Sequence, residues 1–395
     1  MEALLLSNGP GELYTWTRPV LGALRRLGPG VRASIGVVPD QFSSGGESEI
    51  ARSFGADRVL GPRETLALAA SGRRPAASGA GFVLSLGGNL AVALQLGARL
   101  GYPVYRYGFV PTWHRRLRRL YVHDERAARR ARLLGAPRER LEAVGNLVAD
   151  AVAGSAAARA PGKPHILLLT GTRDAMSLPL IPFMLGVADL LGQRFPAASF
   201  AWPPSRLLSA HTLEAGVEGR ERSLLGGVES VREGQRVRTP SGVLVEVIPE
   251  HERYAQMRGA DLALSIPGTN TLELGVAGLP AVVVLPMNKP EIIPLEGVGH
   301  WLGYLPIVGR PLKRAAVRLF VAGLELPVSL PNRLSGEDLM LELTGVLSPH
   351  SVAEQAAALL LNPGELARRR ERLRATMPQP GAAERLVASI LRDVA

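Results

Sequence analysis

The chain contains 395 residues and no cysteine. This absence excludes disulfide bonds, thiolate-bound zinc and a cysteine nucleophile, and it fits a cytoplasmic protein. Aromatic residues make up only 5% of the chain, and no interleaving of aromatic and basic side chains suggests a surface for base stacking. We therefore expect no nucleic-acid partner.

Lysine is almost absent as well. Of 46 basic residues only Lys163, Lys289 and Lys313 are lysines, which leaves 43 arginines, and the net charge is +11. A GC-rich genome produces the same arginine bias. A basic surface nevertheless attracts anionic lipid or phosphorylated substrates.

Neither of the two sequence signals for membrane passage is convincing. Met1–Leu6 runs directly into Ser7–Glu12 without a charged and then an apolar region, so we expect no signal peptide. Residues 75–98 carry no charge and are long enough to span a membrane. Gly81, Gly87, Gly88, Asn89 and Gln95 interrupt them, so we interpret them as a buried strand, a turn and a helix.

Short apolar segments alternate with amphipathic ones, which predicts an α/β protein with mostly parallel sheets. We expect strands at 3–7, 31–38, 58–60, 82–86, 104–107, 121–122, 143–144, 165–169, 243–248, 261–265 and 281–285. We expect helices at 16–27, 48–54, 63–70, 90–100, 124–134, 351–361, 363–374 and 382–394. The Ala/Gly/Ser/Pro-rich residues 151–163 read as a linker. The predicted parts are a domain over 1–155, a second domain over 163–377, and a terminal helix within 378–395 that packs on the first domain or on a partner protomer.

The most informative segment is Asp261–Leu285. It predicts a buried strand, a tight turn at Gly268 and Thr269, a helix that carries Glu273, and a second buried strand. A helix that begins at a glycine turn presents free N–H groups and a positive dipole end, which suit a diphosphate. Glu273 lies on the same helix face as Thr269, where a carboxylate can accept two hydrogen bonds from ribose hydroxyls. The segment indicates a nucleotide-sugar site, and the alternative is an ordinary βαβ unit with a surface glutamate.

Several further motifs occur in order along the chain. They are Val144–Asp150, Leu169–Arg173, Gly268–Glu273, Gly278–Pro280 and Val328–Asn332. Together they resemble the lipid A disaccharide synthase family of GT-B glycosyltransferases, loosely from the first strand to the last helices. The resemblance implies a GT-B fold, in which two Rossmann-like domains face a central cleft. It also implies metal-independent transfer of a sugar, without a cofactor, from a UDP-sugar on the second domain to an acceptor on the first.

By position, Arg173 corresponds to the arginine of the family that is placed to pair with the donor diphosphate. Asn332 corresponds to the asparagine of the family's Ser-Leu-Pro-Asn motif. The alternatives are an exposed arginine at a helix start and an N-cap for a helix over 335–343. The predicted donor site comprises Arg173, Gly268, Thr269, Asn270, Glu273 and Asn332.

The first domain departs from the family pattern. Ser85–Asn89 contains no acid where the family has acidic residues, and Asn146 replaces a histidine of the family. The opening loop keeps its glycines, with Glu12 in place of the family's aspartate. We predict Glu12 as the general base because a loop after a strand places it at the carboxyl edge of the sheet.

A first-turn glutamate that only stabilises the helix dipole is the alternative for Glu12. Gly11 and Asn89 are predicted to bind the acceptor. His114 and His123 are weaker candidates for the base.

Two segments suggest contact with lipid. Residues 113–121 have apolar side chains at helical spacing with arginines between them, which is typical of a basic amphipathic helix. Residues 300–307 add an apolar segment near Lys313 and Arg314. Each segment alone also fits an ordinary helix with a stripe of core residues and solvated arginines.

The sequence therefore favours a cytoplasmic glycosyltransferase, peripheral to the inner membrane, that uses a UDP-sugar and a lipid-linked acceptor. One alternative is a nucleotide-sugar 2-epimerase, against which the scarcity of acids at 84–92 speaks. Another is a non-catalytic relative that binds a nucleotide sugar or glycolipid. Because the family can exchange C-terminal segments, the resemblance also allows a homodimer.

Overall fold

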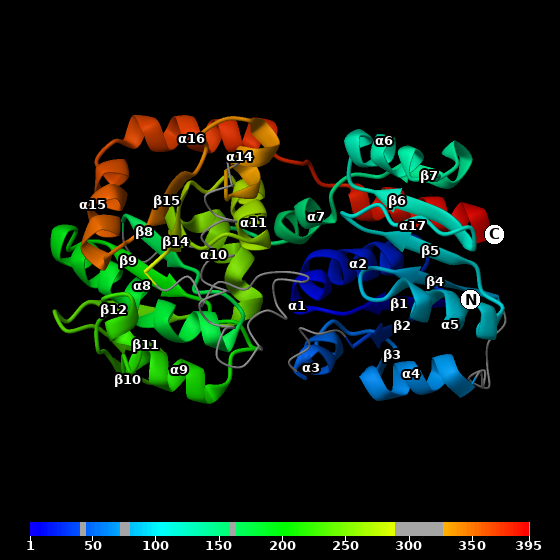
Figure 1. The fold of residues 1–395 in the computed structure, drawn as a ribbon, viewed down its shortest axis with the longest axis horizontal. Helices are drawn as coiled ribbons and strands as arrows, with labels where there is room; N and C mark the ends of the chain where they lie inside the picture. Colours follow the sequence, from blue (N-terminus) through cyan, green and yellow to red (C-terminus); the bar gives the residue numbers. More distant parts are fainter. Residues whose placement is uncertain (40–44, 72–79, 159–162, 289–326, 395) are drawn as a thin grey trace, which may run out of the picture. The chain divides into compact units, whose positions relative to one another are not determined.

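The computed structural model describes residues 1–39, 45–71, 80–158, 163–288 and 327–394. They form two compact units, Met1–Gly154 with Pro378–Ala395 (unit 1) and Ser155–Met377 (unit 2). Each unit is an α/β layer structure built around its own sheet (Figure 1).

Within the described residues, unit 1 holds a seven-stranded parallel sheet in the order β3-β2-β1-β4-β5-β6-β7. The strands are β1 (Glu2–Ser7), β2 (Arg32–Val37), β3 (Arg58–Leu60), β4 (Gly81–Ser85), β5 (Val104–Tyr107), β6 (Leu117–Val122) and β7 (Leu141–Ala143). The helices are α1 (Pro10–Glu12), the π-helical η1 (Leu13–Thr17), α2 (Arg18–Leu27), α3 (Glu47–Arg52), α4 (Pro62–Ser71), α5 (Leu90–Leu100), α6 (Glu125–Leu133), the short η2 (Arg138–Arg140), α7 (Leu147–Ala153) and α17 (Ala382–Val394).

Helix α17 is fixed to unit 1 at both of its ends. At its start, Asp150 accepts hydrogen bonds from the backbone N–H groups of Gly381 (2.7 Å) and Ala383 (3.2 Å). At its end, the carboxylate of Asp393 accepts from the Tyr105 hydroxyl (2.7 Å) and from two nitrogens of Arg118 (2.8 Å each). The last helix of the chain is therefore part of the N-terminal unit.

The described part of unit 2 holds an eight-stranded sheet in the order β10-β11-β12-β9-β8-β13-β14-β15, parallel except for the hairpin at the β10 edge. The strands are β8 (His165–Leu168), β9 (Ser199–Trp202), β10 (Val231–Glu233), β11 (Arg236–Arg238), β12 (Leu244–Val247), β13 (Leu262–Ser265), β14 (Ala281–Pro286) and β15 (Leu341–Gly345). The helices are α8 (Asp174–Arg194), α9 (Ala210–Val217), η3 (Arg222–Leu224), η4 (Glu250–Glu252), α10 (Arg253–Gly259), α11 (Thr269–Ala277), α14 (Leu330–Ser335), α15 (Pro349–Leu360) and α16 (Pro363–Thr376).

Among the described helices, α8 alone is long and apolar enough to cross a membrane, with a mean hydropathy of 1.6. Most of it is covered by protein, since 72% of its most apolar window is buried. Its side chains form the centre of the unit 2 core together with strands β8, β13 and β14. Helix α8 is therefore a core helix of unit 2, although its length and composition would also fit a membrane span.

Two expectations about membrane-like segments can be compared with the structure. From residue 80 onward, the uncharged segment 75–98 is strand β4 followed by helix α5, as predicted. The amphipathic helix expected over 113–121 is wrong, because this segment leads into the interior strand β6. Two of its four arginines form ion pairs, Arg118 with Asp393 and Arg119 with Glu142 (3.3 Å). Residues 300–307 lie outside the described residues.

Candidate functional site

Each sheet has one point where the strand order reverses. In unit 2, β8 and β13 are adjacent, but the chain continues from β8 to β9 on one side and from β13 to β14 on the other. In unit 1, β1 continues to β2 on one side and β4 to β5 on the other. Ligands of open α/β sheets bind outside the carboxyl ends of the strands at such a point. The segments after β8 and β13 carry all the predicted donor residues except Asn332, and those after β1 and β4 carry the predicted acceptor residues.

The turn after β13 has the geometry of an anion site. Gly268 has φ 144° and ψ −172°, a region open only to glycine, and helix α11 begins at the next residue. The Thr271 hydroxyl donates to the Gly268 carbonyl (2.8 Å), and the Asn270 amide donates to Ser265 of β13 (2.8 Å). Gly268 and Thr269 at the start of α11 are exposed, while the N–H of Thr271 donates to the Gly268 carbonyl (3.1 Å).

Glu273 lies one turn further along α11 and is only 3% exposed. Its Oε1 accepts hydrogen bonds from Arg253 Nη2 (2.6 Å) and the Tyr254 hydroxyl (3.0 Å). Burial lowers the pKa of the Arg253 guanidinium, but the charges of Glu273 and Glu250 and the hydrogen bond to Tyr254 raise it by more, so Arg253 stays charged. Burial raises the pKa of Tyr254, which stays a phenol donor.

This arrangement fixes one oxygen of Glu273 and leaves the other for a ligand. In the part of the chain that the structure describes, no group donates a hydrogen bond to its Oε2. A carboxylate held in this way has its rotamer set before a ligand arrives. Such preorganisation favours binding of a vicinal diol.

Arg173 lies in the loop after β8, as the residue that precedes helix α8, and it is exposed. The loop is fixed beneath it, because the Trp202 indole donates to the Thr170 hydroxyl (3.1 Å) and Ser177 donates to the Thr170 carbonyl (3.0 Å). A Cβ on Gly171 would lie 3.0 Å from Ile266 Cδ1 in the loop after β13. The two predicted donor loops are therefore in contact.

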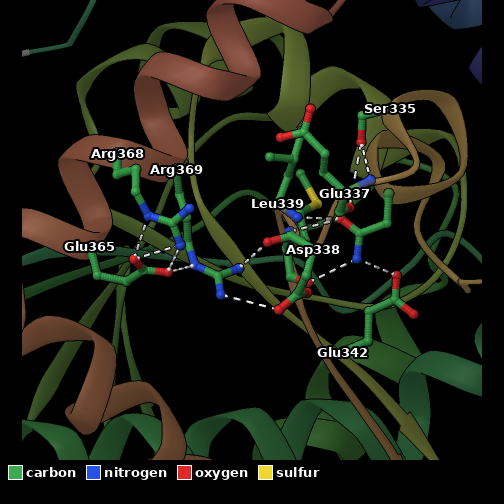
Figure 2. A network of polar contacts seen from close by, with 10 residues as sticks. Ser335, Glu337, Asp338, Leu339, Glu342, Glu365, Arg368 and Arg369 are labelled. Atoms are coloured by element: carbon green, nitrogen blue, oxygen red, sulfur yellow. Dashed lines mark hydrogen bonds and ion pairs between the residues drawn. The ribbon is translucent and has the colours of Figure 1, made fainter.

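Asn332 lies inside α14, and all four of its hydrogen-bonding positions are occupied. Its amide donates to the Met340 carbonyl (2.9 Å) and to Glu342 (2.8 Å), and its oxygen accepts from the N–H groups of Leu339 (2.9 Å) and Met340 (2.8 Å) (Figure 2). The alternative that Asn332 caps a helix over 335–343 is wrong, since β15 begins at Leu341. Its side chain holds the loop between α14 and β15 together.

Glu342 organises the same segment and was not singled out in the sequence. Its carboxylate accepts from the N–H groups of Val328 (2.7 Å) and Ser329 (2.9 Å) and from the Ser329 hydroxyl (2.6 Å). The next N–H, that of Leu330, donates to the Thr271 hydroxyl in the first turn of α11 (3.1 Å). The Val328–Asn332 motif thus contacts the Gly268 turn through the Thr271 hydroxyl.

In unit 1 the loops after β1 and β4 touch at Glu12. A Cβ on Gly87 would lie 2.3 Å from Asn8 Oδ1 and 3.2 Å from Glu12 Cγ, and one on Gly9 would lie 2.7 Å from Glu12 Oε2. These glycines allow the half-buried Glu12 side chain to lie between the loops. The structure therefore places the predicted base at the switch point of the unit 1 sheet.

The remaining unit 1 candidates differ in what they contact. Gly11 accepts a hydrogen bond from Thr15 (2.6 Å), and Asn89 caps α5 through the Ala91 N–H (2.9 Å). His123, at the end of β6, packs its ring against Phe109 at 4.9 Å, and burial lowers its pKa.

His114 accepts from the Arg116 N–H in the loop before β6 (3.1 Å). In the described ranges no three His, Asp or Glu side chains gather as metal ligands would.

No family model matches the chain, and no curated protein matches it by sequence. Solved structures match the chain by fold. A protein from Listeria monocytogenes described as a UDP-N-acetylglucosamine 2-epimerase has a TM-score of 0.57 and 14% identity over 99% of this chain and 96% of its own. MurG of Acinetobacter baumannii has a TM-score of 0.52 and 13% identity over 99% and 100% of the two chains. The UDP-GlcNAc 2-epimerase of Neisseria meningitidis, bound to UDP-GlcNAc, has a TM-score of 0.53 and 13% identity over 99% and 100%.

The fold is GT-B. Both α/β units and their parallel sheets are included in these matches, which confirms the fold class predicted from the sequence. At these identities the likeness concerns the fold, and the chemistry rests on the residues of the site.

Proposed function

We propose that the protein is a glycosyltransferase that binds a UDP-sugar on unit 2 and an acceptor on unit 1. The observation that carries the proposal is the Glu273 carboxylate, with one oxygen fixed by Arg253 and Tyr254, at the switch point of the sheet. A buried acid next to an exposed helix start suits a ligand with a diol at one end and a diphosphate at the other.

The proposed roles follow from the chemistry of sugar transfer. Glu273 accepts the ribose hydroxyls, while the N–H groups after Gly268 and the Arg173 guanidinium neutralise the leaving diphosphate. Glu12 takes the proton from the acceptor hydroxyl that attacks the anomeric carbon. Asn332 and Glu342 act at one remove, by holding the segment behind the Gly268 turn.

A second candidate is a nucleotide-sugar 2-epimerase, because four of the similar structures carry that name. This reaction removes the proton at C2 of the sugar and returns it on the other face, which needs acid–base groups on both faces. Among the described residues at the unit 1 switch point, Glu12 is the acid that the loops enclose, and the loop 85–89 contains none. The side chains therefore favour transfer.

Incubation with UDP-GlcNAc in D2O separates the two reactions. An epimerase exchanges the C2 hydrogen, so the recovered sugar nucleotide gains one deuterium and its C2 epimer forms. A transferase leaves C2 undeuterated and releases UDP, slowly with water and faster with an acceptor. If wild type incorporates deuterium at C2 and Glu12→Gln does not, the protein is an epimerase and the transferase proposal is wrong. If the sugar nucleotide binds and neither reaction occurs, the non-catalytic alternative holds.

The acceptor and the location are further parts of this proposal. The motif resemblance to lipid A disaccharide synthases supports a lipid-linked acceptor at the inner face of the cytoplasmic membrane. The amphipathic helix expected over 113–121 no longer argues for this location, because residues 117–122 form strand β6. Co-sedimentation with anionic vesicles tests it, and a protein that stays in the supernatant at low salt would contradict it. The homodimer also stays a prediction, which light scattering can check.

A further inference from the structure

Arg106 is a largely buried cation that the proposed reaction does not yet use. It lies at the end of β5, opposite Ser85 at the end of β4 in the parallel register. Its Nη1 donates a hydrogen bond to the Ser85 hydroxyl (3.2 Å), while its Nε is buried and has no hydrogen-bond partner. Burial lowers the pKa of its guanidinium.

The other well-covered arginines show what Arg106 lacks. Arg253 is paired with Glu273 and Glu250, and Arg369 with Glu365 and Asp338 (Figure 2). Among the described residues no carboxylate lies within ion-pair distance of Arg106. Burying a cation without a counter-charge destabilises a fold, so this guanidinium is a candidate for completion by a ligand.

The position of Arg106 connects it to the unit 1 site. The Ser85 hydroxyl that it contacts donates to the Gly87 carbonyl (3.2 Å). Gly87 in turn approaches Asn8 and Glu12 across the switch point. The Ser85 hydroxyl therefore connects the guanidinium of Arg106 to Gly87, in the loop that contacts the proposed base Glu12.

We propose that Arg106 binds an anionic group of the acceptor, a phosphate or a carboxylate, while the buried Ser85 holds the guanidinium in place. This inference rests on the proposed function, in which unit 1 holds the acceptor. A guanidinium presents a planar fork of N–H donors, which matches two oxygens of either anion. The attacking hydroxyl is then carried by an acidic acceptor, such as a sugar phosphate or a phospholipid-linked sugar.

Anion binding to four forms of the full chain tests the assignment. Wild type, Arg106→Met, Arg106→Lys and the control Arg99→Met are titrated with inorganic phosphate and with acetate at constant ionic strength. Arg99 is an exposed arginine on α5 of the same unit. We expect saturable binding of at least one anion to wild type and the control, weakened about tenfold or more in R106M and less in R106K. Equal binding to R106M and wild type, or no binding to wild type, overturns the assignment.

Melting curves distinguish a ligand contact from a merely structural role. Without added anion, R106M should melt at or above the wild-type temperature, because an unpaired buried charge has been removed. A purely structural arginine predicts a lower Tm in R106M whether or not phosphate is present. A lower Tm of R106M with and without phosphate, together with equal anion affinity in R106K and wild type, overturns the proposal.

A parallel titration with UDP separates this inference from the proposed function. R106M should bind UDP as wild type does, since the donor residues are in unit 2. A loss of UDP binding in R106M would assign Arg106 to the donor and overturn the acceptor assignment. Failure of wild type to bind UDP, with phosphate binding intact, would instead remove the transferase proposal and its acceptor, and would leave Arg106 as an anion site only.

Discussion

Replacing Glu342 by glutamine should loosen the segment behind the Gly268 turn. The carboxylate accepts four hydrogen bonds of 2.6–2.9 Å, from Val328, from Ser329 twice and from Asn332. A glutamine can keep the three bonds to Oε1, but its NH2 group then faces the Val328 N–H, so one donor loses its acceptor. Losing one charge-assisted bond and leaving a donor unsatisfied costs about 2 kcal/mol.

Calorimetric melting measures this cost. For a unit of this size, a loss of about 2 kcal/mol lowers the Tm by about 4–8 °C. Glu337→Gln is the matched control, because Glu337 lies in the loop directly before β15 (Figure 2) but makes an exposed ion pair with Arg372. Exposed pairs contribute about 0–1 kcal/mol, so the control should stay close to wild type. If E342Q melts no lower than E337Q, Glu342 does not hold the segment and the supporting role assigned to it is wrong.

Three further changes test other parts of the structure. Gly268→Ala introduces a Cβ at φ 144°, which costs about 1–3 kcal/mol and should weaken UDP binding, as titration of a folded variant will show. Arg173→Ala should weaken UDP binding but leave the Tm unchanged, because the exposed arginine contributes charge rather than packing; equal UDP affinity would remove it from the donor site. The hydrogen bond from Arg118 and that from Tyr105 lower the pKa of Asp393 from 3.8 to about 2. A depressed pKa stabilises the fold above pH 3.8 and the effect is lost as the pH falls towards about 2, so wild type should lose about 1 kcal/mol over this window that Asp393→Asn does not lose. Parallel acid titrations of the two proteins would contradict the assignment.

Local patterns were sufficient for much of the fold. The strands 58–60 and 104–107 and the helices 90–100 and 382–394 have the bounds that the sequence predicts. Each is a short apolar segment or an amphipathic repeat between clear turn residues, so its own residues determine its structure. Strands β9, β10, β11 and β15 were not predicted, because each is short; the alternation at Leu341–Thr344 falls at the end of the helix considered over 335–343.

The error at 113–121 has a different cause. Leu117, Leu120 and Tyr121 fit a helical spacing as well as they fit a strand, and the arginines between them look like a solvated face. In the structure Arg118 is neutralised by Asp393, which is 275 residues away in the chain. Neither this pairing of distant charges nor the pairing of β6 with β5 and β7 can be read from a local window.

The candidate site shows the same limit. The Gly268 turn and Glu273 could be found because a nucleotide ligand requires a recognisable local motif. Arg253, Tyr254 and Glu342 could not, since they act by hydrogen bonds to residues or backbone groups at other places in the sequence. For Asn332, the motif indicated an important position, while the structure shows all its hydrogen bonds used within the loop.

The most direct test of the account is calorimetric titration of the purified protein and of Glu273→Gln with UDP. Glu250→Gln is the matched control, because Glu250 is an equally buried acid that contacts the same Arg253 (3.5 Å). The account predicts saturable binding of UDP to wild type and E250Q, weakened about tenfold or more in E273Q. Absence of UDP binding, or equal affinity in E273Q and wild type, would contradict the assignment of unit 2 as a nucleotide-sugar site.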